Sequence, residues 1–223
     1  MVPGIRLVLL GKQGAGKGTQ CVRLARHYVV SHVSTGDIFR AAVRSESELG
    51  RKVKGYLDAG DLVPDEVTLA AVNERLSHPD TRNRGFILDG FPRSVNQADG
   101  LEKLLDPVRL DMVIDLHITT EEALSRLAGR RVCQTCQAIY HVSRPPKYDW
   151  TCDNCGGDVV QRDDDTDDAI RRRLQLYETE TAPLIDYYAN RGMLVTVDGL
   201  GSTDQVAERL VEAIDRQRDP GNL

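Results

Sequence analysis

The chain has 223 residues, of which 40% are hydrophobic and 28% are charged, the proportions of an ordinary globular protein. Its 29 basic and 34 acidic residues give a formal net charge of −5, which argues against a general nucleic-acid binder. No run of about eighteen apolar residues occurs, and the apolar run near the N-terminus is too short for a secretion signal. We therefore expect a cytoplasmic protein that binds neither nucleic acid nor membranes.

Short apolar runs alternate with helical patterns along the chain. The apolar runs have the length and composition of buried strands and lie at 5–10, 85–89, 112–118 and 193–197. Helices are expected at 16–27, at 65–76 after Pro64, after the capping boxes that begin at Thr119 and Ser202, and over 166–191 with a break at Pro183. This alternation predicts an α/β fold with a parallel sheet covered by helices on both faces.

Two segments interrupt the alternation. Residues 34–63 contain helical patterns but no apolar strand, so we expect a small helical insert there. Residues 131–165 contain four cysteines, two prolines, a pair of adjacent glycines and an acidic run. That composition is typical of an independent module inserted into the α/β core.

A glycine-rich segment follows the first expected strand. Its sequence, GKQGAGKGT at 11–19, fits the pattern G-x-x-x-x-G-K. The backbone N–H groups of such a loop converge on phosphate oxygens, and Lys17 would reach the β- and γ-phosphates. A glycine-rich turn without a ligand is the alternative, but the position between a strand and a helix favours nucleotide binding. Gly18 replaces the usual Ser or Thr and Thr19 follows it, which weakens the case for a hydroxyl ligand to a metal.

Charged residues near the breaks in the pattern point to phosphoryl transfer. Asp89 ends an expected strand, where a carboxylate can hold Mg²⁺ through water, although such an Asp is often a turn residue. Phosphoryl transfer is catalysed mainly by positioning and by cations. Taken alone, each arginine is more simply interpreted as a solvated surface group. Five arginines together suggest phosphoryl transfer because each lies next to a loop or on a face near a break in the pattern. They are Arg40, Arg93, Arg130, Arg162 and Arg173.

Four of the five cysteines have the spacing of metal ligands. Cys133-x-x-Cys136 and Cys152-x-x-Cys155 are separated by fifteen residues, which matches a four-thiolate zinc site. Four protein ligands would close the site, so its role would be structural. Reduced surface pairs or disulfides are the alternatives. Cys21 is expected to be a small buried hydrophobe.

A zinc ribbon that binds nucleic acid or protein is the competing class of function. Such a surface is basic, whereas this module runs into the acidic residues of 163–168, which would repel phosphates. The sequence therefore favours an enzyme over a binding module.

Together these motifs resemble the adenylate kinase family. The resemblance rests on GAGKGTQ at 14–20, STGD at 34–37, DGFPR at 89–93 with Gln97, GRR at 129–131, RRRL at 171–174, TAPLI at 181–185 with Tyr187 and Tyr188, and VDG at 197–199. It implies a P-loop nucleoside monophosphate kinase with a parallel five-stranded sheet flanked by helices and two inserted mobile segments. The implied domains are a CORE of 1–33, 64–128 and 164–223, an AMP-binding domain of 34–63 and a zinc-binding LID of 129–163.

The resemblance also implies the reaction. The expected activity is the reversible transfer of the terminal phosphoryl group of ATP to AMP, giving two ADP, for adenine nucleotide homeostasis. A sibling kinase with GTP as donor or another monophosphate as acceptor is the alternative. A monomer is expected, with structural Zn²⁺ and with Mg²⁺ on the nucleotide. Where the family commonly has Gly-Ala-Pro-Gly, this chain has GKQG at 11–14, and we expect Lys12 to be solvated.

The same resemblance assigns the site residues. Lys17 and the arginines 93, 130, 162 and 173 would be catalytic, and Asp89 would hold magnesium through water. The implied ATP contacts are Gly14, Ala15, Gly16, Lys17, Gly18, Thr19, Arg126, Arg130, Ile139, Tyr140 and Gly201. The implied AMP contacts are Thr35, Arg40, Asp61, Leu62, Val63, Gly90, Phe91, Pro92, Arg93, Gln97, Arg162 and Arg173.

Overall fold

Five parallel strands form the central sheet of the protein, as seen in a computed structural model that describes residues 4–218. The ends of the expected CORE, 1–3 and 219–223, lie outside the described residues. The strands are β1 (Arg6–Leu10), β2 (Ser31–Ser34), β3 (Phe86–Asp89), β4 (Met112–His117) and β8 (Leu194–Asp198). Their spatial order is β2-β3-β1-β4-β8, so the prediction of a parallel α/β sheet is confirmed.

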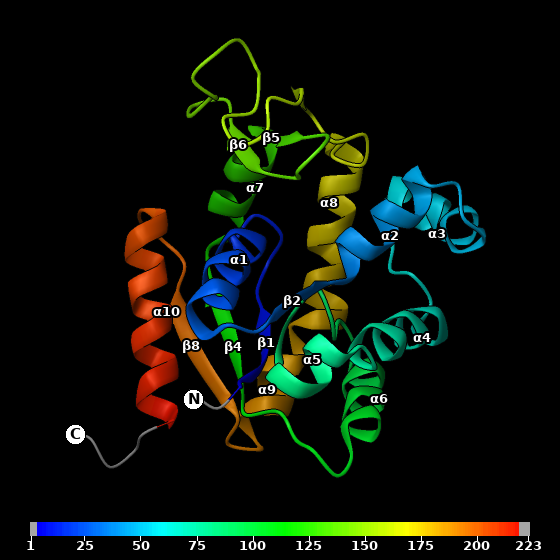
Figure 1. The fold of residues 1–223 in the computed structure, drawn as a ribbon, viewed down its shortest axis with the longest axis vertical. Helices are drawn as coiled ribbons and strands as arrows, with labels where there is room; N and C mark the ends of the chain where they lie inside the picture. The colour runs from blue at the N-terminus through cyan, green and yellow to red at the C-terminus, as the bar shows by residue number, and fades with distance from the viewer. Residues whose placement is uncertain (1–3, 219–223) are drawn as a thin grey trace.

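Helices cover both faces of this sheet (Figure 1). Successive side chains of a strand point to opposite faces, so Leu7 and Leu9 pack into one apolar cluster and Val8 and Leu10 into another. The first cluster includes residues of α1 (Lys17–Tyr28), α7 (Thr120–Ala128), α8 (Asp167–Leu176) and α10 (Thr203–Arg218). The second includes residues of α4 (Asp65–Leu76), α6 (Val95–Leu105) and α9 (Pro183–Ala189). A short helix, α5 (Pro79–Arg84), precedes β3.

The edge strand β2 gave no signal in the sequence. Three of its four residues are polar, and Val33 alone is fully buried, opposite Leu88 of β3. An edge strand that buries one side chain does not produce the apolar run by which the other four strands were predicted. The fifth strand was expected only through the family resemblance.

Two groups of elements project from the sheet and its helices (Figure 1). Residues 34–63 contain α2 (Thr35–Arg44) and α3 (Glu48–Ala59), which share a small apolar cluster with α4. Between α7 and α8 lies an antiparallel sheet of β5 (Arg130–Cys133), β6 (Ile139–His141) and β7 (Val159–Val160), with β5 in the middle. Both groups therefore lie beyond the core that the two large apolar clusters define.

The helical stretch 166–191 is broken at Pro183, as predicted. Helix α8 ends at Leu176, a turn of π-helix, η1 (Tyr177–Thr181), follows, and α9 begins at Pro183. Proline is favoured at the first position of a helix because its missing N–H is not needed there. Turns of π-helix are frequent at functional sites, and here the Thr181 hydroxyl donates a hydrogen bond to the Arg93 carbonyl at 2.9 Å. None of the helices in the described part of the chain is long and apolar enough to cross a membrane.

Candidate active site

One cavity of about 1330 Å³ lies at the carboxyl edge of the central sheet. Ligands bind at this edge in open α/β sheets. Every residue that the sequence implied as a nucleotide contact lines the cavity, and Asp89 lines it too. The volume exceeds the roughly 300–1,000 Å³ of a typical small-molecule site, so there is room for more than one ligand of ordinary size.

The P-loop connects β1 to α1 at the floor of the cavity. Gly14 and Gly16 have φ values of 86° and 97°, a left-handed conformation that glycine adopts without strain. The Lys17 ammonium donates hydrogen bonds to the carbonyls of Gly11 and Lys12, at 2.6 and 2.9 Å. Burial lowers the pKa of Lys17 to about 8, against the opposing effect of Asp89. Lys17 thus lies under the loop, bonded to groups that cannot neutralise its charge.

Asp89 stands at the end of β3, close to the P-loop. Burial by itself would raise the pKa of this carboxyl, but His32, Lys17 and Arg93 together lower it. Asp89 is therefore ionised at neutral pH. An ionised carboxylate beside a phosphate-binding loop can accept hydrogen bonds from the water shell of Mg²⁺, which keeps several of its waters when bound to protein.

The residues implied for the acceptor nucleotide form a hydrogen-bonded group around the loop after β3. The Gly90 carbonyl accepts from the Thr35 hydroxyl at 2.9 Å and from Arg93 Nε at 2.8 Å. The Gln97 side chain accepts from the Arg93 N–H at 2.8 Å and donates to Asp65 at 2.7 Å. Gln97 is buried, so its amide is held in one orientation by these two partners. A nucleobase that forms hydrogen bonds with Gln97 would have to share or replace one of these two hydrogen bonds.

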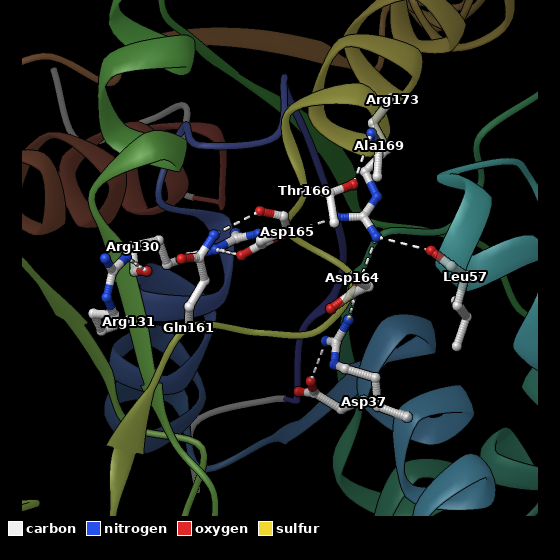
Figure 2. Close-up of polar contacts among 11 residues, drawn as sticks. Asp37, Leu57, Arg130, Arg131, Gln161, Asp164, Asp165, Thr166, Ala169 and Arg173 are labelled. Atoms are coloured by element: carbon white, nitrogen blue, oxygen red, sulfur yellow. Dashed lines mark hydrogen bonds and ion pairs between the residues drawn. The ribbon is translucent and has the colours of Figure 1, made fainter.

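Two buried carboxylates hold the arginines at the start of α8 (Figure 2). Asp165 accepts two hydrogen bonds from Arg130, at 2.7 and 2.5 Å, and a third from Arg173 at 3.0 Å. Asp164 accepts from Arg173 at 2.6 Å. Sequence analysis missed these roles because it treated the whole acidic run as a surface that repels phosphates, whereas Asp165 is only 1% exposed. No local pattern distinguishes these two aspartates from their neighbours.

The cavity carries more positive than negative charge where the arginines meet. Burial, Arg40 and Arg130 lower the pKa of Arg162 to about 10, and Arg162 Nε has no hydrogen-bond partner within the described residues. Burial and Arg173 likewise lower the pKa of Arg93 to about 10. Neighbouring cations repel one another, and this repulsion lowers their pKa values. An anion placed among them offsets the repulsion and stabilises the charged forms. The geometry therefore suits a ligand that carries several phosphate groups.

Helix α8 also contacts the projecting helices of 34–63. Arg173 donates to the Leu57 carbonyl at 3.2 Å, and Arg172 donates to the Asp61 carboxylate at 2.7 Å (Figure 2 shows the first of these). Asp61, together with Leu62 and Val63, lines the cavity. Helix α8 thus contacts both the segment 34–63 and, through Asp165, the arginine of β5.

On the opposite side, the residues implied for ATP lie between α7 and the small sheet. Arg126 donates to the Ala15 carbonyl of the P-loop at 3.3 Å and to the Gly199 carbonyl at 3.2 Å. Ile139 is 44% exposed and faces the cavity, as do Tyr140 and Gly201. An apolar side chain, an aromatic ring and free backbone around one opening can accommodate a flat base.

Lys12 is not solvated, contrary to our expectation. Its side chain is 15% exposed, forms an ion pair with Glu178 of η1 at 2.8 Å and donates to the Thr120 hydroxyl at 2.7 Å. The π-helical turn brings Glu178 to the P-loop, which the sequence could not indicate. Lys12 therefore connects the P-loop to η1 and to the start of α7.

The four cysteines of the small sheet form a compact cluster. Their sulfurs all lie within 4.8 Å of one another, and the pairs Cys133–Cys155 and Cys136–Cys152 are 3.5 Å apart. Sulfurs at about 2.3 Å from a tetrahedral zinc ion are about 3.8 Å apart, so the cluster fits zinc with little adjustment. All four are free thiols, which excludes the disulfide alternative here. The Tyr140 hydroxyl lies 3.3 Å from the Cys152 sulfur and lowers the pKa of that thiol.

The fold and the site define a P-loop phosphotransferase of the nucleoside monophosphate kinase class. The family model described as adenylate kinase matches residues 9–193. The chain is 48% identical to an adenylate kinase of Streptomyces avermitilis over 217 residues, which covers 96% of this chain and 98% of the relative. It is 50% identical over 213 residues to one from Acidothermus cellulolyticus, covering 94% and 98%, and 46% identical over 216 residues to one from Thermodesulfovibrio yellowstonii, covering 96% and 100%. The chain belongs to the adenylate kinase family.

Proposed function

We propose that this enzyme transfers the terminal phosphoryl group of ATP to AMP, reversibly, and forms two ADP. One observation supports the proposal: a single cavity is lined by the P-loop, by the hydrogen-bonded group of Thr35, Arg93 and Gln97, and by a set of arginines. A donor bound at the P-loop and an acceptor bound at this group would bring their phosphates together among the arginines.

The donor side would bind ATP through the P-loop and the residues around α7. Backbone N–H groups of 14–19 would surround the phosphates, and Lys17 would exchange its two carbonyl partners for phosphate oxygens. Arg126 and Arg130 would contact the phosphates from α7 and β5. The adenine base would lie beside Ile139, Tyr140 and the Gly201 backbone, all of which line the cavity.

The acceptor side would bind AMP. Arg93 would hold its phosphate, since a guanidinium forms two parallel hydrogen bonds with such an oxyanion. Gln97 would read the adenine edge from its fixed orientation. The other contacts would be Thr35, Arg40, Asp61, Leu62, Val63, Gly90, Phe91, Pro92, Arg162 and Arg173.

Positioning and charge would carry the transfer step. Charge spreads over the equatorial oxygens of the transferring group, and fixed cations in a cavity closed to water stabilise it. Arg130, Arg162 and Arg173 would serve as these cations, and Asp164 and Asp165 hold two of them, Arg130 and Arg173, before the ligands arrive. Mg²⁺ bound with the nucleotide would neutralise β- and γ-phosphate charge, and Asp89 would orient its waters.

We further propose that the two projecting groups are mobile domains of a monomer that acts in the cytoplasm. Residues 34–63 would close over AMP, and the LID of 129–163 would close over ATP. The four cysteines would hold one structural Zn²⁺ in the LID, with no position left for a substrate.

An assay with paired nucleotides tests this function. Purified enzyme at nanomolar concentration receives ATP with AMP, GMP, CMP or UMP, and GTP with AMP, and the nucleoside diphosphates are measured. We expect ATP with AMP to be the preferred pair. A clear preference for GTP as donor, or for another monophosphate as acceptor, would identify a sibling kinase, and no transfer with any pair would contradict phosphotransferase function.

A further inference from the structure

Three potential metal ligands meet beneath the P-loop, apart from the four-cysteine cluster. They are Cys21 of α1, His32 of β2 and Asp89 of β3, and their sulfur, ring nitrogen and carboxylate oxygen lie within 4.8 Å of one another. Cys21 is fully buried, and the other two line the nucleotide cavity. The cluster thus has one inner ligand and two that face the ligand space.

The histidine lies against the Asp89 carboxylate in this arrangement. Its Nε2 is buried and has no hydrogen-bond partner among the residues that the structure describes. Nε2 nevertheless lies 3.4 Å from Asp89 Oδ2. Ligands at about 2.0 Å from a tetrahedral ion are about 3.3 Å apart, so the two atoms are separated as a shared cation would hold them.

The donor set selects the kind of cation. A thiolate, an imidazole and a carboxylate together suit Zn²⁺ or Co²⁺, whereas Mg²⁺ requires oxygen ligands in an octahedral arrangement. Three protein ligands would leave a fourth position open, and two of the three, His32 and Asp89, line the cavity. Burial keeps the Cys21 thiol protonated by raising its pKa, so a bound ion would displace that proton to solvent.

We propose that Cys21, His32 and Asp89 form a second Zn²⁺ site, and that zinc bound there inhibits the enzyme. The ion would occupy the carboxylate that otherwise orients the water shell of the magnesium–nucleotide complex. Inhibition rests on the proposed role of Asp89 in phosphoryl transfer, but binding of the ion does not. Zinc bound to Cys21, His32 and Asp89 would be distinct from the zinc of the LID, whose binding would leave the activity unchanged.

Cobalt titration tests the binding. Enzyme that holds one zinc per chain in its LID is titrated with Co²⁺, whose bond to a thiolate gives a near-ultraviolet charge-transfer band. We expect one additional Co²⁺ per chain, with an affinity weakened by at least about tenfold in Cys21→Ser and in His32→Gln. Cys21→Ala provides a second test of the thiol if the serine variant is poorly folded. His27→Gln, which changes an exposed histidine on the same helix as Cys21, is the matched control and should bind as the wild type does.

A zinc titration of the transferase reaction tests the consequence. We expect wild-type activity to fall with added Zn²⁺ and to recover when Mg²⁺ is raised. Cys21→Ser, compared with its own activity without zinc, should be at least about tenfold less sensitive to Zn²⁺. An unchanged cobalt band in Cys21→Ser, or no additional cobalt in the wild type, would overturn the site even in a fully active enzyme. Cobalt bound as expected without any zinc inhibition would overturn the inhibitory role. Cobalt binding in a protein without transferase activity would instead contradict the proposed function and leave the metal site in place.

Discussion

Lys17 is a cavity residue whose charge depends on pH close to neutrality. Burial lowers the pKa values of Arg93 and Arg162 to about 10, so both guanidinium groups remain charged at neutral pH. Burial lowers the pKa of Lys17 to about 8, close enough to neutrality for the free enzyme to lose this charge in mild base. A phosphate ligand would favour the charged form and raise this pKa again.

The first prediction concerns the pH dependence of catalysis. Lys17 acts as a cation, so the kcat/KM for ATP should fall as the pH rises through about 8, where the free enzyme loses the proton. An arginine at this position stays charged in this pH range, so the kcat/KM of Lys17→Arg should not fall as the pH rises through about 8. The different shape of the side chain should lower the rate at every pH. Lys17→Ala should lower turnover by roughly 10²–10³-fold or more without loss of the fold, by comparison with the loss of one oxyanion donor. A variant that kept over a tenth of wild-type turnover would contradict the P-loop role.

The second prediction concerns the acceptor phosphate. Arg93→Ala should raise the KM for AMP and lower turnover, with much less change in the affinity for ATP, because the P-loop holds ATP on the other side of the cavity. Steady-state kinetics with each nucleotide varied in turn measure this asymmetry. Equal losses for both nucleotides would show that Arg93 is a structural residue, which its bond to the Gly90 carbonyl would then explain.

At the scale of elements, ion pairs connect β5, in the proposed LID, to the start of α8, and we call this connection the joint. Asp164 and Asp165 directly precede Thr166, whose hydroxyl caps α8 by accepting from the Ala169 N–H. Their carboxylates hold Arg130 of β5 and Arg173 of α8. The same guanidinium groups are the proposed partners of the transferring phosphate. The joint is therefore stable without ligand and can also rearrange when phosphates compete for the arginines.

The third prediction concerns this joint. Asp165→Asn leaves two poorly exposed guanidinium groups without a full counter-charge, and breaking a buried ion pair in this way typically costs about 3–5 kcal/mol. The amide retains some hydrogen bonding, so we expect a loss near about 3 kcal/mol in the free energy of unfolding. Urea denaturation measures it. The control is Asp163→Asn, an exposed neighbour, for which the change should stay within about 0.5 kcal/mol.

Nucleotides supply a second measurement on the same variant. Phosphates can take over the role of the missing carboxylate, so ATP and AMP together should raise the Tm of Asp165→Asn by more than they raise that of the wild type. An equal rise in both proteins would show that the arginines keep their carboxylate partners in the liganded state.

At the scale of the molecule, the proposed LID has its own three-stranded sheet, which zinc would stabilise. Its own apolar cluster is small and consists largely of the metal ligands and their neighbours. Zinc binding in small peptides supplies on the order of 10–16 kcal/mol, far more than such a cluster could provide alone. The metal would therefore determine whether the LID is folded, while the central sheet has its own core.

The fourth prediction follows for the metal. Purified protein should contain one zinc per chain, and the double change of Cys133 and Cys136 to Ser should remove it. The variant should unfold at a markedly lower temperature, with the LID melting first, and should keep substantial turnover in the cold. Metal analysis, calorimetry and assays at low temperature measure these effects. Loss of all turnover in the cold, with the CORE folded by circular dichroism, would show that zinc does more than stabilise.

Sequence patterns predicted the parts of the molecule that depend on local chemistry. Strands buried on both faces, the P-loop and the cysteine pairs each carry a recognisable local signal, and Pro183 marked the break in the long helix. The sequence could not predict β2, because an edge strand needs few apolar residues. It also missed the partners of Lys12 and the buried pair Asp164 and Asp165, since those depend on charges brought together from distant segments.

The strand order also has a consequence for synthesis on the ribosome. The strands β3, β1 and β4, which are neighbours in the sheet, can pair once residue 117 has been made. Helix α10 and strand β8 come much later, and residues such as Val206, Leu210 and Ile214 cover the face of β1 that carries Leu7 and Leu9. In a nascent chain that pauses after β4, α1 can cover part of this apolar face and the rest remains exposed to water. Such exposure favours aggregation, so rapid translation of the LID segment and of α8 would protect the growing enzyme.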